Sequence, residues 1–311
     1  MEESEDEKSD FRRRNLKMKK VTFEGWKNCV ELQSGDFKLI VTTEIGPRVM
    51  GGFIGDSRNI FNVDPKLAGT SGHDKWVNYG GHRLWHSPEA KPRTYAPDNS
   101  KATAKELADG SVLFTAGTEA STGICKSIII KPLGDNKFRV EHHLRNDNPW
   151  EIELAPWALS VMAPGGTAIA PLNKAPKALL PNTFFAFWPY TDLADERITF
   201  GHDFLLVKQR SDCPATKIGF NCQNGWLAYA NHGTMFVKSF EYFVDAEYPD
   251  NGCSIEIYSC SSMLEAETLA PLYAISEGEE IVHVEEWLCT PGPESIETEA
   301  DAAKYLPVPA I

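Results

Sequence analysis

The stretch Cys29-Val-Glu-Leu-Gln-Ser34, followed by Gly35-Asp36 and by Phe37-Lys-Leu-Ile-Val-Thr-Thr43, sets the fold class. Apolar and polar residues alternate in both flanking segments, which is the pattern of a strand with one buried face. The Gly-Asp pair between them favours a turn. The stretch therefore predicts an antiparallel hairpin, and much of the chain repeats this pattern.

Similar short segments recur at intervals of ~8–12 residues, as expected for a sandwich or barrel. They occupy residues 111–116, 125–131, 138–144, 150–155, 158–162, 204–209, 217–220, 226–230, 235–240, 254–259, 264–269 and 280–289. Only residues 102–108 and 301–305 have a helical composition. No glycine-rich loop opens a helix, which excludes a nucleotide-binding Rossmann unit. We therefore predict an all-β antiparallel protein with a single domain over residues 20–311.

Composition narrows the class of partner. The chain has 311 residues, of which 42% are hydrophobic, and this suffices for a sizeable core. The net charge of -13 argues against a nucleic-acid partner, because phosphate binding needs clustered Lys and Arg. No apolar run reaches the ~18 residues of a membrane span. Seven Cys without a CxxC pair disfavour zinc and thioredoxin-type sites. We expect a cytoplasmic protein with no membrane partner.

Residues 1–19 differ from the rest in composition. An acidic block precedes a basic block in this segment, and neither contains enough apolar residues to form a core. Nor does the segment contain the apolar stretch of a secretory signal peptide. We expect a disordered charged tail. A targeting or partner-binding arm is the alternative.

The segment Tyr79-Gly-Gly-His-Arg-Leu-Trp-His-Ser-Pro-Glu89 is the leading functional candidate. It gathers two imidazoles, a guanidinium and a carboxylate around a tryptophan, although buried polar groups cost free energy unless they are paired. In a strand, alternation places His82, Leu84 and His86 on one face and Arg83 and Trp85 on the other. These residue types suit a hydroxyl-rich ligand. A strand end with internal salt bridges is the structural alternative.

Neighbouring segments extend this candidate site. Gly80 and Gly81 permit a close backbone approach, and the glycine-rich bend at 45–53 is expected to bring Arg48 near them. The aromatic run 184–192 can line a sugar-binding cleft or fill the core. His142 and His143 are adjacent in a predicted strand and therefore point to opposite faces, so we expect no metal site there.

The order of several segments resembles the galactose-mutarotase-like (aldose 1-epimerase-like) superfamily, and within it an uncharacterised family. The segments that carry the resemblance are TTEIGPR at 42–48, GGHRLWHSPE at 80–89, ELAPWALSVMAPGG at 153–166, LPN at 180–182, WPYTD at 188–192 and MLEAETLAP at 263–271. They span about residues 25 to 290. The resemblance implies an antiparallel β-supersandwich and a small saccharide ligand. We expect no cofactor and no metal ion.

Site residues follow from the resemblance one at a time. In sugar mutarotases an Arg and a His after an early glycine-rich strand hold the sugar, and Arg83 with His82 or His86 resembles them. The base in that family is a late-strand Glu, which Glu267 resembles. Where that family has the His that acts as the general acid, this chain has Trp157, so His82, His86 or His232 is expected to supply the acid. The ligand-binding candidates are Arg48, Arg83, Trp85, Glu89, Trp157, Lys238 and Glu265.

Three functions remain open at this point. An epimerase of aldoses or uronates needs a base and an acid, and burial near Trp would raise the pKa of Glu267 toward neutrality. A binding module would use Arg48, Arg83, Trp85 and Lys238 to hold an acidic saccharide without chemistry. A glycosidase needs two carboxylates, and Glu89 or Glu256 opposite Glu267 would supply them.

Overall fold

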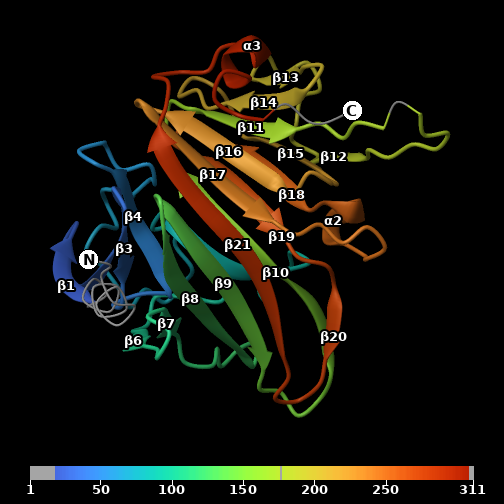
Figure 1. Ribbon diagram of the computed structural model, residues 1–311. Coiled ribbons are helices and arrows are strands. Elements are labelled where there is room, and N and C mark those ends of the chain that lie inside the picture. The colour runs from blue at the N-terminus through green and yellow to red at the C-terminus, as the bar shows by residue number, and fades with distance from the viewer. Residues whose placement is uncertain (1–17, 176, 308–311) are drawn as a thin grey trace, which may run out of the picture.

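The computed structural model describes residues 18–175 and 177–307, which form two antiparallel sheets packed as a sandwich (Figure 1). The first sheet contains, in spatial order, β1 (Lys19–Phe23), β2 (Trp26–Ser34), β3 (Phe37–Thr42), β4 (Arg48–Ile54), β5 (Gly81–Ser87), β10 (Ile152–Met162), β19 (Leu264–Leu269), β18 (Ile255–Ser259), β15 (Thr216–Phe220) and β12 (Phe185–Phe187), and β20 (Tyr273–Ile275) pairs with β10. The second contains β13 (Ile198–Phe200), β14 (Phe204–Lys208), β11 (Thr167–Pro171), β16 (Trp226–Asn231), β17 (Thr234–Phe240), β21 (Glu280–Pro291), β9 (Lys137–Asn146), β8 (Ile124–Gly134), β7 (Val112–Thr115) and β6 (Thr103–Glu106).

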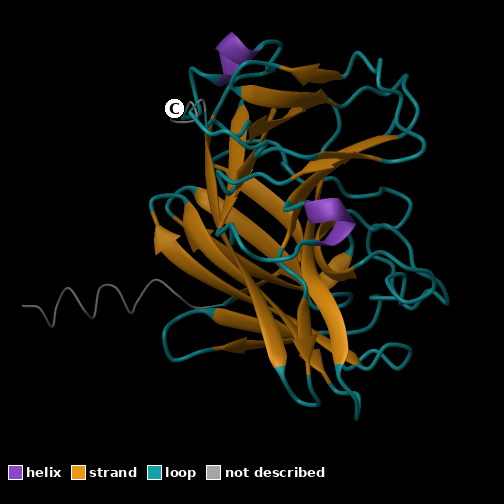
Figure 2. Ribbon diagram, turned by 90° about the vertical axis from the view of Figure 1, so that its right-hand side faces the viewer, coloured by secondary structure: helices purple, strands orange, loops and turns teal. Residues whose placement is uncertain are grey.

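Helix is confined, among the described residues, to two four-residue segments at the periphery, α2 (Pro249–Gly252) and α3 (Glu299–Ala302) (Figure 2). α3 starts with a capping box between Thr298 and Asp301 and overlaps the helix predicted at 301–305. Neither helix is long or apolar enough to cross a membrane. The all-β prediction is confirmed.

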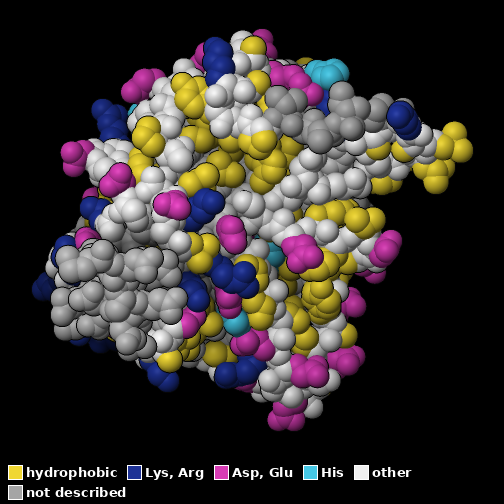
Figure 3. Space-filling view, viewed as in Figure 1, with side chains coloured by type: hydrophobic (Ala, Val, Ile, Leu, Met, Phe, Trp, Pro, Cys, Tyr) yellow, Lys and Arg dark blue, Asp and Glu magenta, His cyan; other side chains and the backbone are white. Residues whose placement is uncertain are grey.

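The apolar faces of the two sheets meet in one core. At its centre Phe61, from the loop after β4, packs on Phe236 of β17 and Trp287 of β21 with ring centroids 5.6 and 5.9 Å away. All three rings are buried, and aromatic contacts of this kind add to the free energy gained from burial. On the outside, basic and acidic side chains are interspersed over the face seen in Figure 3.

The hairpin that sets the fold class forms as predicted. Ser34 of β2 pairs with Phe37 of β3, and the turn between them contains Gly35 at φ 58°. The two strands predicted at 150–155 and 158–162 form one continuous strand, β10, which starts at Ile152. Pro156 has no N–H group to donate to a neighbouring strand. This part of β10 nevertheless pairs with β5, and the Pro156 carbonyl accepts a hydrogen bond from Ala270 N at 3.0 Å.

The helix predicted at 102–108 is wrong. Residues 103–106 form the edge strand β6, which pairs with β7 through a turn at 107–110. Asp109 accepts a hydrogen bond from Ser111 Oγ at 2.6 Å and fixes this turn. Strand pairing therefore overrides the local preference of an alanine-rich segment. The predicted tail at 1–19 lies outside the described residues up to 17, and Lys19 already belongs to β1.

Candidate functional site

An open cleft of about 510 Å³ lies on the face of the first sheet that points away from the second sheet. It crosses β5, β10, β19, β18 and β15, which are neighbours in the sheet. Its lining is rich in aromatic side chains and consists of Trp76, Asn78, Arg83, Trp85, Glu89, Tyr95, Trp157, Leu159, Trp188, Tyr190, Ala215, Lys217, Tyr258, Met263 and Glu265. The volume lies in the range of ~300–1,000 Å³ found for small-molecule sites.

Strand register brings the polar residues of the cleft together. Arg83 pairs with Leu159, and Tyr258 pairs with Glu265. Directly opposed residues of antiparallel strands point to the same face, so these side chains share one surface. Loops before and after β5 and the loop after β12 add the aromatic rings at the rim.

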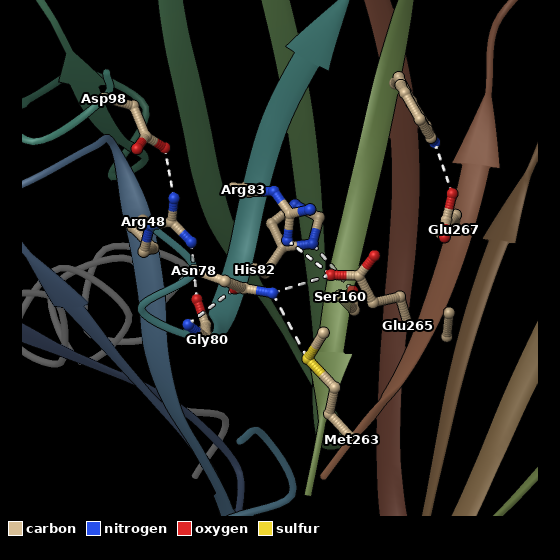
Figure 4. A network of polar contacts seen from close by, with 12 residues as sticks. Arg48, Asn78, Gly80, His82, Arg83, Asp98, Ser160, Met263, Glu265 and Glu267 are labelled. Atoms are coloured by element: carbon tan, nitrogen blue, oxygen red, sulfur yellow. Dashed lines mark hydrogen bonds and ion pairs between the residues drawn. The ribbon is translucent and has the colours of Figure 1, made fainter. Parts of the chain in front are cut away.

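Arg83 is held at the floor of the cleft by an acidic neighbour and two indoles. Its Nη1 lies 3.1 Å from Glu265 Oε1, and Asn78 Nδ2 donates to the same oxygen at 3.3 Å (Figure 4). The guanidinium lies 4.4 Å from the ring centroid of Trp85 and 5.5 Å from that of Trp76. This contact orients the Arg83 fork and neutralises Glu265.

A second charged group, Lys217, connects the cleft to two buried carboxylates. Lys217 Nζ lies 3.1 Å from Glu267 Oε2 and 2.5 Å from Glu256 Oε2. It also lies 4.7 Å from the ring centroid of Trp157 and 4.5 Å from that of Trp188. Both carboxylates are fully buried. Sequence reasoning named Glu267 and Glu256 but not the lysine between them.

Glu267 lies just beneath the cleft and is not part of its lining. It shares the cleft-facing side of β19 with Glu265, and Trp157 Nε1 donates to its Oε2 at 2.8 Å. Burial raises the pKa of Glu267 to about 7, although the Lys217 ammonium opposes this shift. Burial likewise raises the pKa of Glu256, against Lys217 and reinforced by Glu267. A carboxyl that titrates near neutrality can give or take a proton under ordinary conditions.

His82 lies on the opposite side of the sheet from Arg83, as strand alternation requires. It is fully buried between the sheets, with Nδ1 2.9 Å from Ser160 Oγ and Nε2 2.7 Å from His142 Nε2. The prediction that His82 shares a cleft with Glu267 is therefore wrong. It conflicted with the alternation rule that assigned Arg83 and His82 to different faces.

The inner polar network is complete without a bound metal. His142 Nδ1 lies 3.0 Å from the His283 carbonyl, which only accepts, so the hydrogen is on Nδ1 and Nε2 accepts from His82. Ligand atoms of His82, His142 and Glu285 lie within 4.8 Å of one another. However, Trp287 Nε1 already donates to Glu285 at 2.7 Å, and a cation there would meet the neighbouring ammonium of Lys238.

The remaining predicted residues divide between the core and the surface. Lys238 is fully buried in the second sheet, 2.8 Å from Glu285, and donates to the Ala158 carbonyl at 3.1 Å. His86 is buried on the inner side of β5, where burial lowers its pKa to about 2. His232 lies in the turn between β16 and β17. None of these three lines the cleft, so their predicted contact with a cleft ligand is wrong.

Arg48 supports the glycine turn before β5, as the sequence indicated. It pairs with Arg83 in register, donates from Nη1 to the Gly80 carbonyl at 2.7 Å and forms an ion pair with Asp98. It is fully buried and does not line the cleft. Arg83, Trp85, Glu89, Trp157 and Glu265, which the sequence offered as ligand-binding candidates, do line it.

Several cleft residues were missed by sequence reasoning. Trp188 and Tyr190 fall in the aromatic run 184–192, for which the sequence does not distinguish a cleft lining from core packing. Trp76 and Tyr95 lie in polar, proline-containing loops, where an aromatic ring is itself a signal for binding. Lys217 and Tyr258 carried no such signal, because only the register of β15 and β18 brings them to the site.

Comparison with known proteins gives a fold. No protein-family model matches the chain, and no curated protein matches it. A galactose mutarotase-like protein from Lactobacillus casei matches with a TM-score of 0.58 at 11% identity, over 85% of this chain and 100% of that one. A galactose mutarotase-like protein from Clostridium acetobutylicum matches with a TM-score of 0.52 at 10% identity, over 89% of this chain and 99% of that one. A protein from Synechocystis matches with a TM-score of 0.56 at 9% identity, over 88% of this chain and 100% of that one.

Proposed function

This chain has the galactose-mutarotase-like fold, and from the cleft on its first sheet we propose that it binds a saccharide. The observation that carries the proposal is the lining of the cleft, in which aromatic rings surround Arg83, Glu265 and Asn78. Aromatic rings cover the apolar faces of sugar rings, and a few fixed polar groups bind the hydroxyls. Both kinds of group occur in this cleft.

We further propose that the protein interconverts the anomers of an aldose. This reaction needs a base that takes the proton from the C1 hydroxyl and an acid that protonates the ring oxygen. The glutamates of β19 are the candidate base, with Glu265 in the floor of the cleft and Glu267 beneath that floor. No histidine lines the cleft in the described part of the chain, so the Lys217 ammonium takes the place of the expected His acid.

Binding without chemistry is the second candidate, and a specific observation favours it. Lys217 is locked between Glu256 and Glu267, and these carboxylates raise its pKa despite its burial. An ammonium held in this way releases its proton reluctantly. A saccharide could then bind in the cleft unchanged.

The test follows a freshly dissolved pure anomer of each of several aldoses by NMR, with and without the protein. The epimerase proposal predicts faster equilibration, reduced ~10²–10⁴-fold by Glu265→Gln or Glu267→Gln with binding largely retained. Glu286→Gln, an exposed glutamate on β21, is the matched control. Binding without acceleration supports the second candidate. If no sugar binds, both proposals fail.

A further inference from the structure

We propose that the cleft takes a neutral saccharide of at least two rings, with one ring stacked at each end. This inference rests on the proposed function and specifies its ligand. It differs from the acidic saccharide that the sequence suggested for a binding module. It follows from the distance between the aromatic groups, from the pairing of the charges and from buried donors without partners.

The aromatic residues of the cleft form two separate groups. The first, here called the β5 end, consists of Trp76, Trp85 and Tyr95, whose ring centroids lie 5.0, 5.4 and 5.1 Å apart in edge-on contact. The second, the β15 end, consists of Trp188, Tyr190 and Tyr258, with the two tyrosine rings 6.4 Å apart. Each group offers its own stacking surface.

The two ends are too far apart for one sugar ring. β10 and β19 lie between β5, which carries Trp85, and β18, which carries Tyr258, so three interstrand spacings of ~4.8 Å separate these two strands by about 14 Å. Stacked rings lie within ~4.5–7 Å of each other. A single ring stacked at one end therefore leaves the other end without a partner. Between the ends the floor contains Trp157, Leu159 and Glu265, which can run beneath a linked pair of rings.

The two cations of the cleft, Arg83 and Lys217, are already paired with carboxylates of the protein. Arg83 is paired with Glu265, and Lys217 is paired with Glu267 and Glu256. Glu89 adds a further carboxylate, to which Tyr95 donates. An anionic ligand would have to break one of these pairs and leave a buried carboxylate without its cation, which is costly. A neutral ligand leaves every pair in place.

Three buried N–H donors at the β5 end have no hydrogen-bond acceptor within the described residues. They are Trp85 Nε1, Trp76 Nε1 and Arg83 Nε. Trp85 and Arg83 are only 3% and 1% exposed, so leaving these donors unpaired has a cost. Hydroxyl and ring oxygens of a sugar accept such bonds. We therefore infer that the more tightly held ring lies at the β5 end, next to these donors.

The experiment screens an array of neutral and acidic mono- and oligosaccharides and then measures affinities by calorimetry. Neutral disaccharides should bind at least tenfold more tightly than their component monosaccharides, and uronate-containing disaccharides should bind more weakly than neutral ones. Tyr190→Ala, at the exposed β15 end, should weaken disaccharide binding ~2- to 10-fold and leave monosaccharide binding within about twofold. Trp150→Ala, which removes an exposed tryptophan outside the cleft, is the matched control and should change neither.

The outcomes separate this inference from the proposed function. Equal affinity for monosaccharides and disaccharides, or preference for an acidic sugar, overturns the inference and leaves saccharide binding standing. A disaccharide affinity that is the same in Tyr190→Ala and the wild type overturns it as well. If no sugar on the array binds, the proposed function itself fails.

Discussion

Glu267 and Glu256 share one lysine in a space closed to solvent, and this sets their protonation. Both carboxyls are fully buried, and Lys217 balances the charge of only one of them. Burial penalises both charges and raises the pKa of each carboxyl, to about 7 for Glu267. Repulsion adds to this, from Glu265 for Glu267 and from Glu267 for Glu256. The folded protein therefore holds a proton between pH 4.5 and 7 that the unfolded chain releases.

We expect this proton to appear in the stability of the protein. A raised carboxyl pKa means that the contribution of Glu267 to stability falls as pH rises from about 4.5 toward 7, by up to ~3 kcal/mol. Glu267→Gln removes this group, so the variant should gain stability relative to the wild type as pH increases from 5 to 8. Urea denaturation at several pH values measures the difference, with Glu286→Gln as exposed control. A difference that does not change with pH would refute the assignment.

At the scale of single elements, β5 shows how one strand serves two purposes. Arg83 and Trp85 face the cleft, while His82 and His86 face the core. The strand can start where it does because Gly80 adopts φ 89° directly against the loop before it. A Cβ at this position would lie 2.1 Å from the Asn62 carbonyl oxygen.

The tight contact makes Gly80→Ala a test of how the cleft strand is anchored. The substitution adds a backbone clash to the ~1–2 kcal/mol cost of the left-handed conformation. We expect Gly80→Ala to lose at least ~2 kcal/mol more in free energy of unfolding than Gly72→Ala. Gly72 has φ 75° but open space around it, which isolates the conformational cost. Equal losses for the two variants in chemical denaturation would show that the clash is relieved.

The same strand shows what sequence alone could predict. Alternation and turn residues correctly located most strands, because these signals are local. The sequence also placed Arg83 and His82 on opposite faces, yet similarity to sugar mutarotases grouped them in one site, and the local rule was right. Lys217 was beyond reach, since it meets Glu267 only through the register of β15 with β18 and of β18 with β19. The helix prediction for residues 102–108 failed because pairing with β7 at the sheet edge outweighs the helix preference of the alanines.

The whole sandwich has a layer of buried polar residues between its sheets. His82, His142 and His283 are held neutral there, and burial lowers the pKa of His142 to about 4 and of His283 to about 3. Burial works against the charge of Glu285, but the ion pair with Lys238 outweighs it and lowers the pKa of Glu285 to about 2. Both sheets contribute to this layer, so its protonation affects the packing of the entire molecule.

We therefore expect the protein to be sensitive to acid. Below about pH 6.5 the unfolded chain binds protons that the buried histidines refuse, which costs ~3 kcal/mol of stability at pH 4 for each of His142 and His283. Below about pH 4.5 the contribution of Glu285 is lost as well. In Glu267→Gln, which lacks the opposing contribution of that carboxyl, urea denaturation at pH 7.5, 6 and 4.5 should show a steep decline, and adding His202→Gln, which alters an exposed histidine, should not change it. Constant stability of Glu267→Gln over this range would contradict neutral histidines in the core.

The aromatic cleft also has an optical consequence. Four of the eight tryptophans lie in it, and the Trp85 centroid is 5.0 Å from that of Trp76 and 5.5 Å from that of Trp157. Indoles this close share their excited states, and these three come from a loop and two different strands that only folding brings together. Near-ultraviolet circular dichroism and intrinsic fluorescence therefore include a signal from the cleft, beside that of the four tryptophans outside it. A ligand that binds between the two ends of the cleft should therefore change the tryptophan fluorescence and the near-ultraviolet circular dichroism of the protein, without any attached dye.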